Sequence, residues 1–355
     1  MTADGHPETG PVLVAMSGGV DSSVAAALLA HQGHEVVGVT MKLWGGAQDS
    51  GCCSVSDVDD ARRVADQLGI DHHVFNFGDD FDRHVVDPYV AAHAAGRTPN
   101  PCIECNRHLK FDKLLRRADA LGFSRVATGH HARIVETPAG RRIARGADAA
   151  KDQSYVLHML TPGQLARVEL PLGAMTKDDV RRLAAELGLR TADKPDSQDV
   201  CFITATGGGR QRFLGDRLPL TPGRVVDTDG VEAGTVDAVE LVTIGQRKGL
   251  GVSGEAEPRY AVAVDIGTAT VTIGRRSELF CDASPIDALA WTGVPEPGAV
   301  QVQTSAHGVT AAGRVTLDDD GVHRVEWVEP HRRVAPGQAL VFYIDDVVVG
   351  SATAA

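Results

Sequence analysis

Cysteine is scarce in this chain, and long apolar runs are absent. The 355 residues include six cysteines, too few for the disulfide framework of a secreted protein of this size. No uninterrupted apolar segment approaches the length of a membrane span, and residues 1–10 lack the basic and apolar stretches of a signal peptide. We therefore expect a cytoplasmic protein that associates with no membrane and opens with a short disordered tail at 1–10.

A general excess of positive charge is absent as well. The formal net charge is −12, which argues against binding of polyanions across the whole surface. Residues 107–151 are an exception, because eleven Lys and Arg outnumber four Asp and Glu there. Taken alone, such a segment is more typical of solvated helix faces than of a binding surface.

The first half of the chain alternates short apolar segments with helical patterns. Residues 12–16, 35–41, 73–77 and 125–128 have the composition of strands, and residues with helical spacing lie between them. This alternation predicts an α/β Rossmann-like parallel sheet, covered on both faces, that binds its ligand at the carboxyl ends of the strands.

The pattern changes near residue 208. Beyond it, short strands rich in Val, Thr and Ile, separated by Gly, Pro and Asp, replace the helices. We therefore expect the Rossmann-like domain at 11–208, a small β-rich domain at 209–277 and a C-terminal β-barrel domain at 278–355.

One loop predicts a phosphate site. Residues 17–23 read Ser-Gly-Gly-Val-Asp-Ser-Ser, between the strand at 12–16 and a helical pattern. Backbone N–H groups at a helix N-terminus bind phosphate. The loop has neither the Gly-Lys-Ser/Thr of a Walker loop nor the Gly-x-Gly-x-x-Gly of dinucleotide folds. It resembles the PP-loop of ATP pyrophosphatases, which split ATP into AMP and pyrophosphate.

Three cysteines lie in segments of distinctive composition. Cys102 and Cys105 lie between a proline-rich stretch and a helix with several cations, an environment that lowers the pKa of a thiol. Cys201 lies between a polar and an apolar stretch and, by itself, is more typical of a buried apolar side chain. Two distant cysteines beside an ATP-cleaving loop indicate sulfur transfer to an activated oxygen.

Taken together, these motifs resemble those of the tRNA-specific 2-thiouridylases, the MnmA family. The resemblance spans almost the whole chain, in segments 17–23, 97–111, 127–133, 151–155, 197–203, 243–251 and 336–338. It implies that ATP, with Mg²⁺, adenylates the carbon-2 oxygen of the wobble uridine in the tRNAs for Lys, Glu and Gln. Sulfur, delivered by a cysteine desulfurase or a relay protein, then displaces AMP.

The resemblance also assigns roles to residues. Cys201 would carry a persulfide, and Cys105 would attack it. ATP would contact Ala15, Met16, Ser17, Gly18, Gly19, Val20, Asp21, Ser22, Met41 and Gly129, with Asp21 near Mg²⁺. The tRNA would contact His130, Lys151, Asp152, Gln153 and Gln338, which makes phosphate contacts by the basic segment 107–151 the favoured interpretation.

Cys102 departs from the family pattern, in which many members carry Asp at this position. The substitution opens an alternative in which Cys102, Cys105 and Cys201 hold three irons of a 4Fe–4S cluster. The persulfide route remains favoured, with Cys102 as a bystander also open.

Two other functions fit parts of the sequence. An amidating ligase of the PP-loop class would use an amine and need no cysteine pair. A non-catalytic RNA-binding protein would bind nucleotide without releasing pyrophosphate.

Overall fold

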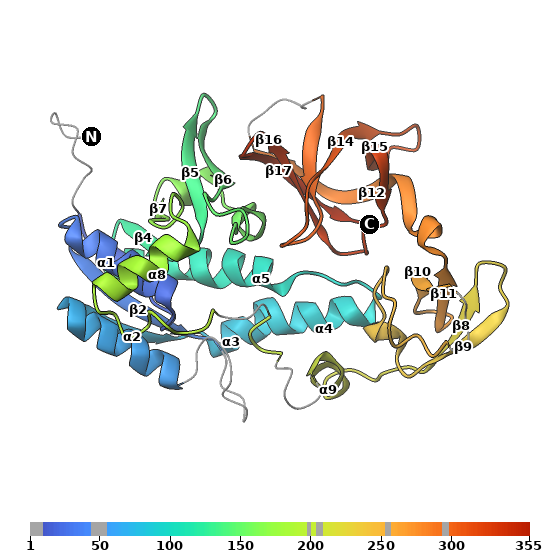
Figure 1. The fold of residues 1–355 in the computed structure, drawn as a ribbon, viewed down its shortest axis with the longest axis horizontal. Coiled ribbons are helices and arrows are strands. Elements are labelled where there is room, and N and C mark those ends of the chain that lie inside the picture. Colours follow the sequence, from blue (N-terminus) through green and yellow to red (C-terminus); the bar gives the residue numbers. More distant parts are fainter. Residues whose placement is uncertain (1–9, 44–54, 197–199, 204–208, 253–256, 293–297) are drawn as a thin grey trace. The chain divides into compact units, whose positions relative to one another are not determined.

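The structure is a computed structural model that describes residues 10–43, 55–196, 200–203, 209–252, 257–292 and 298–355. The expected tail, apart from Gly10, therefore lies outside the described residues. The chain forms two compact units, and it passes between them several times (Figure 1). The first unit comprises Met1–Val85, Cys102–Phe202 and Asp346–Val348, and the second comprises Val86–Pro101, Ile203–Asp345 and Val349–Ala355.

A five-stranded parallel sheet organises the first unit, as the strand and helix alternation predicts. Its order is β3-β2-β1-β4-β7. The strands are β1 (Val12–Ala15), β2 (Val36–Lys42), β3 (Asp71–Asn76), β4 (Arg125–Thr128) and β7 (Val168–Glu169). The order reverses between β1 and β4, which is where such sheets bind their ligands.

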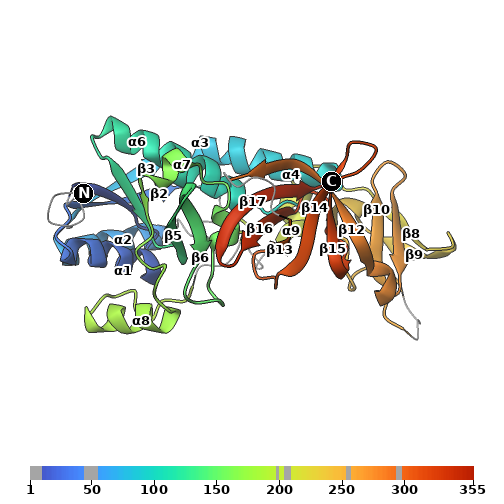
Figure 2. The same ribbon diagram turned by 90° about the horizontal axis from the view of Figure 1, so that it is seen from above.

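Helices cover both faces of this sheet. They include α1 (Val20–His31), α2 (Val55–Leu68), α6 (Leu114–Ala120) and α8 (Lys177–Glu186). Figure 2 shows α1, α2 and α8 on one side of the sheet and α6 on the other. The predicted Rossmann-like arrangement is confirmed.

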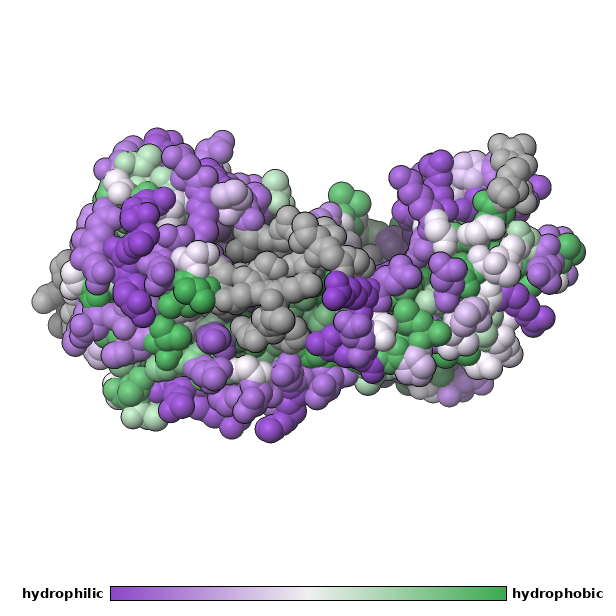
Figure 3. Space-filling model, turned by 90° about the horizontal axis from the view of Figure 1, so that it is seen from below, coloured by the Kyte–Doolittle hydropathy of each residue, from purple (hydrophilic) through white to green (hydrophobic). Residues whose placement is uncertain are grey.

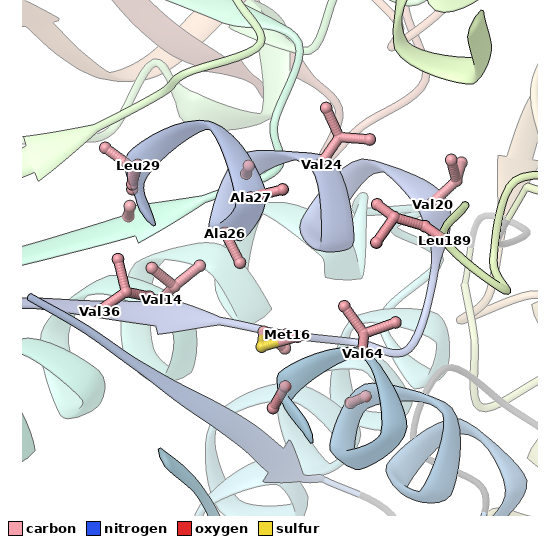
Figure 4. Close-up of a cluster of buried hydrophobic side chains, with 14 of the residues drawn as sticks. Val14, Met16, Val20, Val24, Ala26, Ala27, Leu29, Val36, Val64 and Leu189 are labelled. Atoms are coloured by element: carbon pink, nitrogen blue, oxygen red, sulfur yellow. The ribbon is translucent and has the colours of Figure 1, made fainter. Parts of the chain in front are cut away.

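Helix α1 is apolar almost all round because it is covered on two sides. Val14 of β1 and Met16, which follows β1, pack on one side of it together with Val64 of α2, and Leu189 lies beside Val20 at the start of the helix (Figure 4). Its central residues are three consecutive buried alanines, which favour helix and let neighbouring elements approach closely. This packing fixes the start of α1, and with it the loop that precedes the helix.

The cysteine-bearing segment is helical in an unusual way. It is made of α5 (Pro101–Glu104), a π-helical segment (Cys105–Lys113) and then α6. The preceding helices are α3 (Gly78–Phe81), a short π-helical stretch (Asp82–Val86) and α4 (Asp87–Ala94). The wider winding of a π-helix is rare and is frequent at functional sites.

The remaining elements of the first unit are short. They are the hairpin β5 (Ala132–Thr137) and β6 (Gly140–Arg145), a 3₁₀ turn (Ser154–Leu157) and α7 (Pro162–Leu165). Helix α9 (Gly209–Gly215) opens the long C-terminal part of the second unit.

Two β-structures make up most of the second unit. The first is a four-stranded sheet of order β10-β11-β8-β9. Its strands are β8 (Gly223–Asp227), β9 (Glu232–Val236), β10 (Tyr260–Asp265) and β11 (Thr270–Gly274). The second follows the order β12-β15-β14-β13-β16-β17 and closes into a barrel by pairing β12 with β17.

The barrel strands are β12 (Phe280–Trp291), β13 (Val300–Gln303), β14 (Ala311–Leu317), β15 (His323–Arg332), β16 (Ala339–Ile344) and β17 (Val347–Ala354). Each of these two structures has its own cluster of buried hydrophobic side chains. The cluster of the four-stranded sheet includes Val225 and Ile273, and that of the barrel includes Leu340 and Phe342. The expected pair of β-rich domains, the last a barrel, is confirmed; their boundaries stay a prediction.

The surface is largely polar. Hydrophilic residues cover most of the described surface on the face drawn in Figure 3, and hydrophobic residues lie between them in small groups. Among the helices of the described residues, none has the length and apolar character that crossing a membrane requires.

Candidate active site

The phosphate-loop motif lies between the carboxyl end of β1 and the start of α1. Gly19 is the N-cap of α1, in an extended conformation, and offers no side chain to cap the first turn. Ser22 braces the loop instead, because its hydroxyl accepts from the backbone N–H of Ser17 at 3.1 Å and donates to the carbonyl of Gly19 at 3.1 Å. The geometry suits an anion at the helix N-terminus.

Two glycines allow the loop to pack tightly. Gly18 has a φ of +74°, and a Cβ there would lie 2.2 Å from the carbonyl oxygen of Asp57 in α2. A Cβ on Gly129, just after β4, would lie 2.7 Å from the backbone nitrogen of Ser22. Both residues that the resemblance assigns to ATP are thus required for close backbone packing, whatever else they contact.

The other residues assigned to ATP differ in exposure. Ala15, Met16, Val20, Ser22 and Met41 are buried. Ser17 is exposed, and Gly19 and Asp21 are partly exposed. The open side of the loop is therefore formed by Ser17, Gly19 and Asp21.

Asp21 is held by a lysine that sequence reasoning missed. Lys177, the first residue of α8, places its Nζ 2.7 and 2.8 Å from the two carboxylate oxygens of Asp21, and its side chain is only 9% exposed. His131 Nε2 lies 3.2 Å from the same carboxylate. Burial alone would raise the pKa of Asp21, but the hydrogen bonds and charges of His131 and Lys177 hold this pKa below its usual value. Asp21 is therefore ionised at neutral pH.

Asp196 extends this network. Its carboxylate oxygens lie 2.8 Å from Lys177 Nζ, 2.7 Å from Lys151 Nζ and 2.7 Å from a guanidinium nitrogen of Arg181. Burial would raise the pKa of Asp196, yet these cations hold it far below its usual value. The hydrogen bond to Asp196 in turn raises the pKa of Lys151. Three cations, Lys151, Lys177 and Arg181, thus meet the carboxylates of Asp21 and Asp196 beside the phosphate loop, and Asp148 accepts the backbone N–H of Lys177 at 2.9 Å.

Three of the residues assigned to tRNA, Lys151, Asp152 and Gln153, have bonding partners within the fold. Gln153 donates its backbone N–H to the carbonyl of His131 and accepts the N–H of His131 on its side-chain oxygen, each at 2.9 Å. The side chain of Asp152 is 5% exposed, and its carboxylate bonds Arg145, the backbone N–H of Gly146 and Ser154. Lys151 is held by Asp196, as described above. Their contacts with tRNA stay a prediction.

His130 is buried directly beside this loop. Its Nδ1 lies 2.7 Å from the hydroxyl of Thr128, and burial holds its pKa well below the ordinary histidine value. His130 is therefore neutral at physiological pH, and a contact to tRNA would be a hydrogen bond rather than an ion pair.

Both cysteine-bearing segments pack against helix α3. Phe202, next to Cys201, contacts the Phe81 ring edge to face, with 5.5 Å between ring centroids. Lys113, the last residue of the π-helical segment that begins at Cys105, bonds Asp80. Cys105 is buried, whereas Cys102 and Cys201 are partly exposed. The first unit thus holds the phosphate loop and all three cysteines.

Comparisons with known proteins agree with this site. Residues 10–205 match the model described as tRNA methyl transferase HUP domain, residues 211–275 the tRNA methyl transferase PRC-barrel domain, and residues 283–354 the Aminomethyltransferase beta-barrel domain. The tRNA-specific 2-thiouridylase MnmA of Chloroflexus aurantiacus is 46% identical over 349 residues, 96% of each chain. That of Mycobacteroides abscessus is 47% identical over 356 residues, 96% of this chain and 98% of the relative.

This chain belongs to the MnmA family. Among solved structures, the U34-tRNA thiolase NcsA from Methanococcus maripaludis with its 4Fe–4S cluster is 19% identical, with a TM-score of 0.37, over 55% of this chain and 62% of that one. At this identity and TM-score, the similarity is no evidence for an iron–sulfur cluster in this chain.

The geometry of this MnmA family member does not fit an iron–sulfur cluster. Cys102, Cys105 and Cys201 all lie within the described residues, and across that part of the chain no three His, Cys, Asp or Glu side chains converge to hold a metal ion. We therefore derive no step through a cluster.

The basic segment 107–151 is not one open face. Many of its cations have internal partners: Arg116 pairs with Asp112, Arg125 with Glu169, Arg145 with Asp152, and buried Arg142 donates to the carbonyls of Ala139 and Arg141. The count of charges in the sequence overstates the charge available to RNA.

Gln338, the last residue assigned to tRNA, lies in the second unit. Its side-chain nitrogen donates to the carbonyl of Thr98, which precedes the cysteine-bearing helix in the chain. Sequence reasoning gave no indication of this contact, nor of the roles of Lys177 and Arg181, because each joins residues far apart in the chain.

Proposed function

We propose that this protein uses ATP and Mg²⁺ to replace the carbon-2 oxygen of the wobble uridine by sulfur in the tRNAs for Lys, Glu and Gln. Membership of the MnmA family supports uridine thiolation in tRNA and the use of ATP. The observation that carries the proposal is the phosphate loop, with its Lys177–Asp21 pair, in the same unit as Cys105 and Cys201. Such a reaction belongs in the cytoplasm.

The loop residues support the adenylation step. The N–H groups at the start of α1, the hydroxyl of Ser17 and the ammonium of Lys177 stabilise negative charge on the departing pyrophosphate, and Ser22 holds the loop in shape through its bonds to Ser17 and Gly19. Ionised Asp21 is available to Mg²⁺, and Met41 and Gly129 border the adenosine. ATP supplies the adenylate that turns the uracil oxygen into a leaving group.

The cysteines supply the sulfur. A persulfide on Cys201, formed by a cysteine desulfurase or a relay protein, is attacked by the thiolate of Cys105. The new Cys105–Cys201 disulfide forms as the outer sulfur leaves as HS⁻, which adds to carbon 2 of the adenylated uracil and displaces AMP. An external thiol reductant then returns both cysteines to the reduced state.

Recognition of tRNA is proposed for His130, Lys151, Asp152, Gln153 and Gln338. Lys151 suits a phosphate contact best, because its side chain is 41% exposed and its raised pKa keeps it charged. The wobble base must leave its stack in the anticodon loop to reach the adenylation site.

Mass spectrometry of tRNA nucleosides tests the proposal. With ATP, Mg²⁺, a cysteine desulfurase, cysteine and a thiol reductant, the wild type is expected to form 2-thiouridine at the wobble position and to release pyrophosphate. Cys105→Ser and Cys201→Ser should still release pyrophosphate but form no 2-thiouridine. Cys281→Ser is the matched control, because Cys281 lies in β12 of the second unit, and it should behave as the wild type.

Other outcomes would favour the rival functions. Tight tRNA binding without pyrophosphate release would indicate a non-catalytic RNA-binding protein. ATP-dependent product formation that survives Cys201→Ser and yields no thiouridine would indicate an amidating ligase. Loss of 2-thiouridine only in Cys105→Ser would contradict the assigned persulfide carrier.

A further inference from the structure

The first peptide of the phosphate loop, between Met16 and Ser17, is held on both sides. The carbonyl of Met16 accepts a hydrogen bond from the hydroxyl of Thr40, with 2.8 Å between the two oxygens. The N–H of Ser17 donates to the hydroxyl of Ser22 at 3.1 Å. The N–H of Met16 donates to the carbonyl of Val39 at 2.8 Å. Strand β2 and helix α1 therefore fix the orientation of this peptide between them.

A histidine of the neighbouring strand supports Thr40. Nε2 of His72, in β3, lies 2.9 Å from the Thr40 hydroxyl. A carbonyl oxygen can only accept, so the single hydroxyl hydrogen of Thr40 goes to Met16, and the hydroxyl oxygen accepts from Nε2–H of His72. Burial lowers the pKa of His72, which keeps the imidazole neutral with its proton on Nε2. The hydrogen bonds therefore run in one direction, from the imidazole through the hydroxyl to the loop carbonyl.

These side chains pack closely against one another. Gly38 lies two positions before Thr40 in β2 and pairs with His72 in the sheet. A Cβ on Gly38 would lie 2.6 Å from Sδ of Met16 and 3.2 Å from Cδ2 of His72. Thr40 is 1% exposed, so water does not readily replace its hydroxyl as the partner of the Met16 carbonyl. The whole arrangement lies within the first unit.

The orientation of this peptide matters because Ser17 follows it directly. Ser17 is exposed on the open side of the loop, whereas Ser22, which accepts its N–H, is buried. A rotated peptide would lose the bond to Ser22 and turn the Ser17 hydroxyl out of its present direction. It would also place a carbonyl oxygen, which repels anions, where the N–H of Ser17 now lies.

We propose that Thr40, supported by His72, is a positioning residue for adenylation, fixing the Met16–Ser17 peptide so that the Ser17 hydroxyl faces the departing pyrophosphate. This rests on the proposed function. Thr40 and His72 act through the loop and need no contact with ATP. Because Ser17 acts on charge that develops during pyrophosphate departure, losing its orientation should lower kcat more than it changes KM for ATP.

Thr40→Val tests the proposal, because valine keeps the shape of threonine and removes the hydroxyl. At saturating tRNA, we expect kcat for pyrophosphate release to fall about tenfold, the effect of losing one hydrogen bond to a buried carbonyl, and KM for ATP to stay within about twofold. Thr40→Ser keeps the hydroxyl and should retain kcat within about twofold of wild type. Thr191→Val is the matched control and should change neither constant, because Thr191 is 1% exposed and its hydroxyl has no hydrogen-bond partner among the described residues.

A double-mutant cycle with Ser17→Ala identifies the residue through which Thr40 acts. Thr40→Val should slow Ser17→Ala by less than about twofold, although it slows the wild type about tenfold. A general loosening of the fold would slow both backgrounds equally.

His72→Leu provides a second route, with Thr40 intact, and keeps the proposal testable if Thr40→Val folds poorly. It should slow pyrophosphate release, and His72→Gln, which keeps an N–H donor, should slow it less.

Three results would overturn the proposal: equal kcat values for Thr40→Val and Thr40→Ser, effects of Thr40→Val and Ser17→Ala that simply multiply, or a raised KM for ATP with an unchanged kcat. Wild-type rates in both Thr40→Val and His72→Leu would overturn it as well. Failure of the wild type to release pyrophosphate and form 2-thiouridine in the same assay would instead contradict the proposed function.

Discussion

Lys177 is a nearly buried cation shared by two carboxylates at the phosphate loop. Its ammonium bonds both oxygens of Asp21 and one of Asp196. If Lys177 turns toward an arriving phosphate, Asp21 keeps its contact with His131, and Asp196 keeps its contacts with Lys151 and Arg181. At the scale of single residues, Lys177 is the cation outside the phosphate-loop motif that we expect to act on the departing pyrophosphate.

Replacing Lys177 by Met should slow pyrophosphate release by about 10- to 100-fold, because one donor to the developing negative charge is lost. Rapid-quench measurement of pyrophosphate with saturating tRNA and ATP checks this. Lys194→Met is the matched control, since Lys194 is also bonded to two carboxylates, those of Asp57 and Asp60. Equal effects of the two variants would show that Lys177 acts only through packing.

At the scale of elements, the π-helical segment decides which way Cys105 faces. Its nine residues run from Cys105 to Lys113 and continue into α6, whose Leu114, Leu115 and Ala118 are buried against the first unit. Since α6 is anchored, the winding of the π-helical segment sets the rotation of everything before it. Residue propensities distinguish helix from strand but do not separate π from α winding.

Deleting Asp112 should return the segment to α winding and rotate Cys105 by about 100° relative to α6. We expect a folded protein that releases pyrophosphate but has lost most 2-thiouridine formation. Asp112→Ala is the control, because it removes the same side chain and its pairing with Arg116 without a change of register. Circular dichroism checks the fold, and normal thiolation by the deletion variant would contradict the role assigned to the π winding.

At the scale of the whole molecule, the chain is interleaved between its two units. Helix α4 and the residues up to Pro101 belong to the second unit, although residues on both sides of them belong to the first. His93 of α4 is buried, and its Nδ1 lies 3.1 Å from the carbonyl of Glu240. The second unit is therefore built from segments that precede and follow residue 202.

Cutting the chain at an engineered protease site between residues 203 and 209 should leave the two fragments associated. The reason is that α4, which lies on the first fragment, packs against residues of the second. His93 contacts the carbonyl of Glu240, and the ring of Tyr89 contacts that of Phe213. Size-exclusion chromatography of the cut protein should give one peak that contains both fragments. His93→Ala should weaken this association, and separate peaks from the cut wild-type protein would contradict the interleaved architecture.

Much of the fold followed from local patterns. Alternating apolar segments predicted the parallel sheet and the later barrel, because period and composition reflect burial on one or two faces. The loop at 17–23 was recognisable because binding a phosphate depends on consecutive residues. Two other contacts could not be recognised in this way. Lys177 and Asp21 are 156 residues apart in the sequence, and Gln338 and Thr98 are 240 residues apart.

Charged groups also make contacts that local sequence does not show. The family resemblance favours phosphate contacts by the basic segment 107–151, and within the fold several of its cations bond carboxylates and carbonyls. Asp152 was assigned to tRNA by resemblance, and its carboxylate is buried among Arg145, Gly146 and Ser154. Charge can be counted from a sequence, but its partners depend on which loops meet in space.

The sequence by itself determined the class of fold, the family and the motifs of the reaction, because each depends on residue types at fixed local spacing. Only the tertiary structure decided that three cations and two carboxylates meet at the phosphate loop and that Cys105 starts a π-helical segment. Only it showed that the barrel holds the peptide ahead of that segment. The physical reason is that hydrogen bonds, ion pairs and helix winding depend on distances and orientations, which residue order leaves open until distant segments pack.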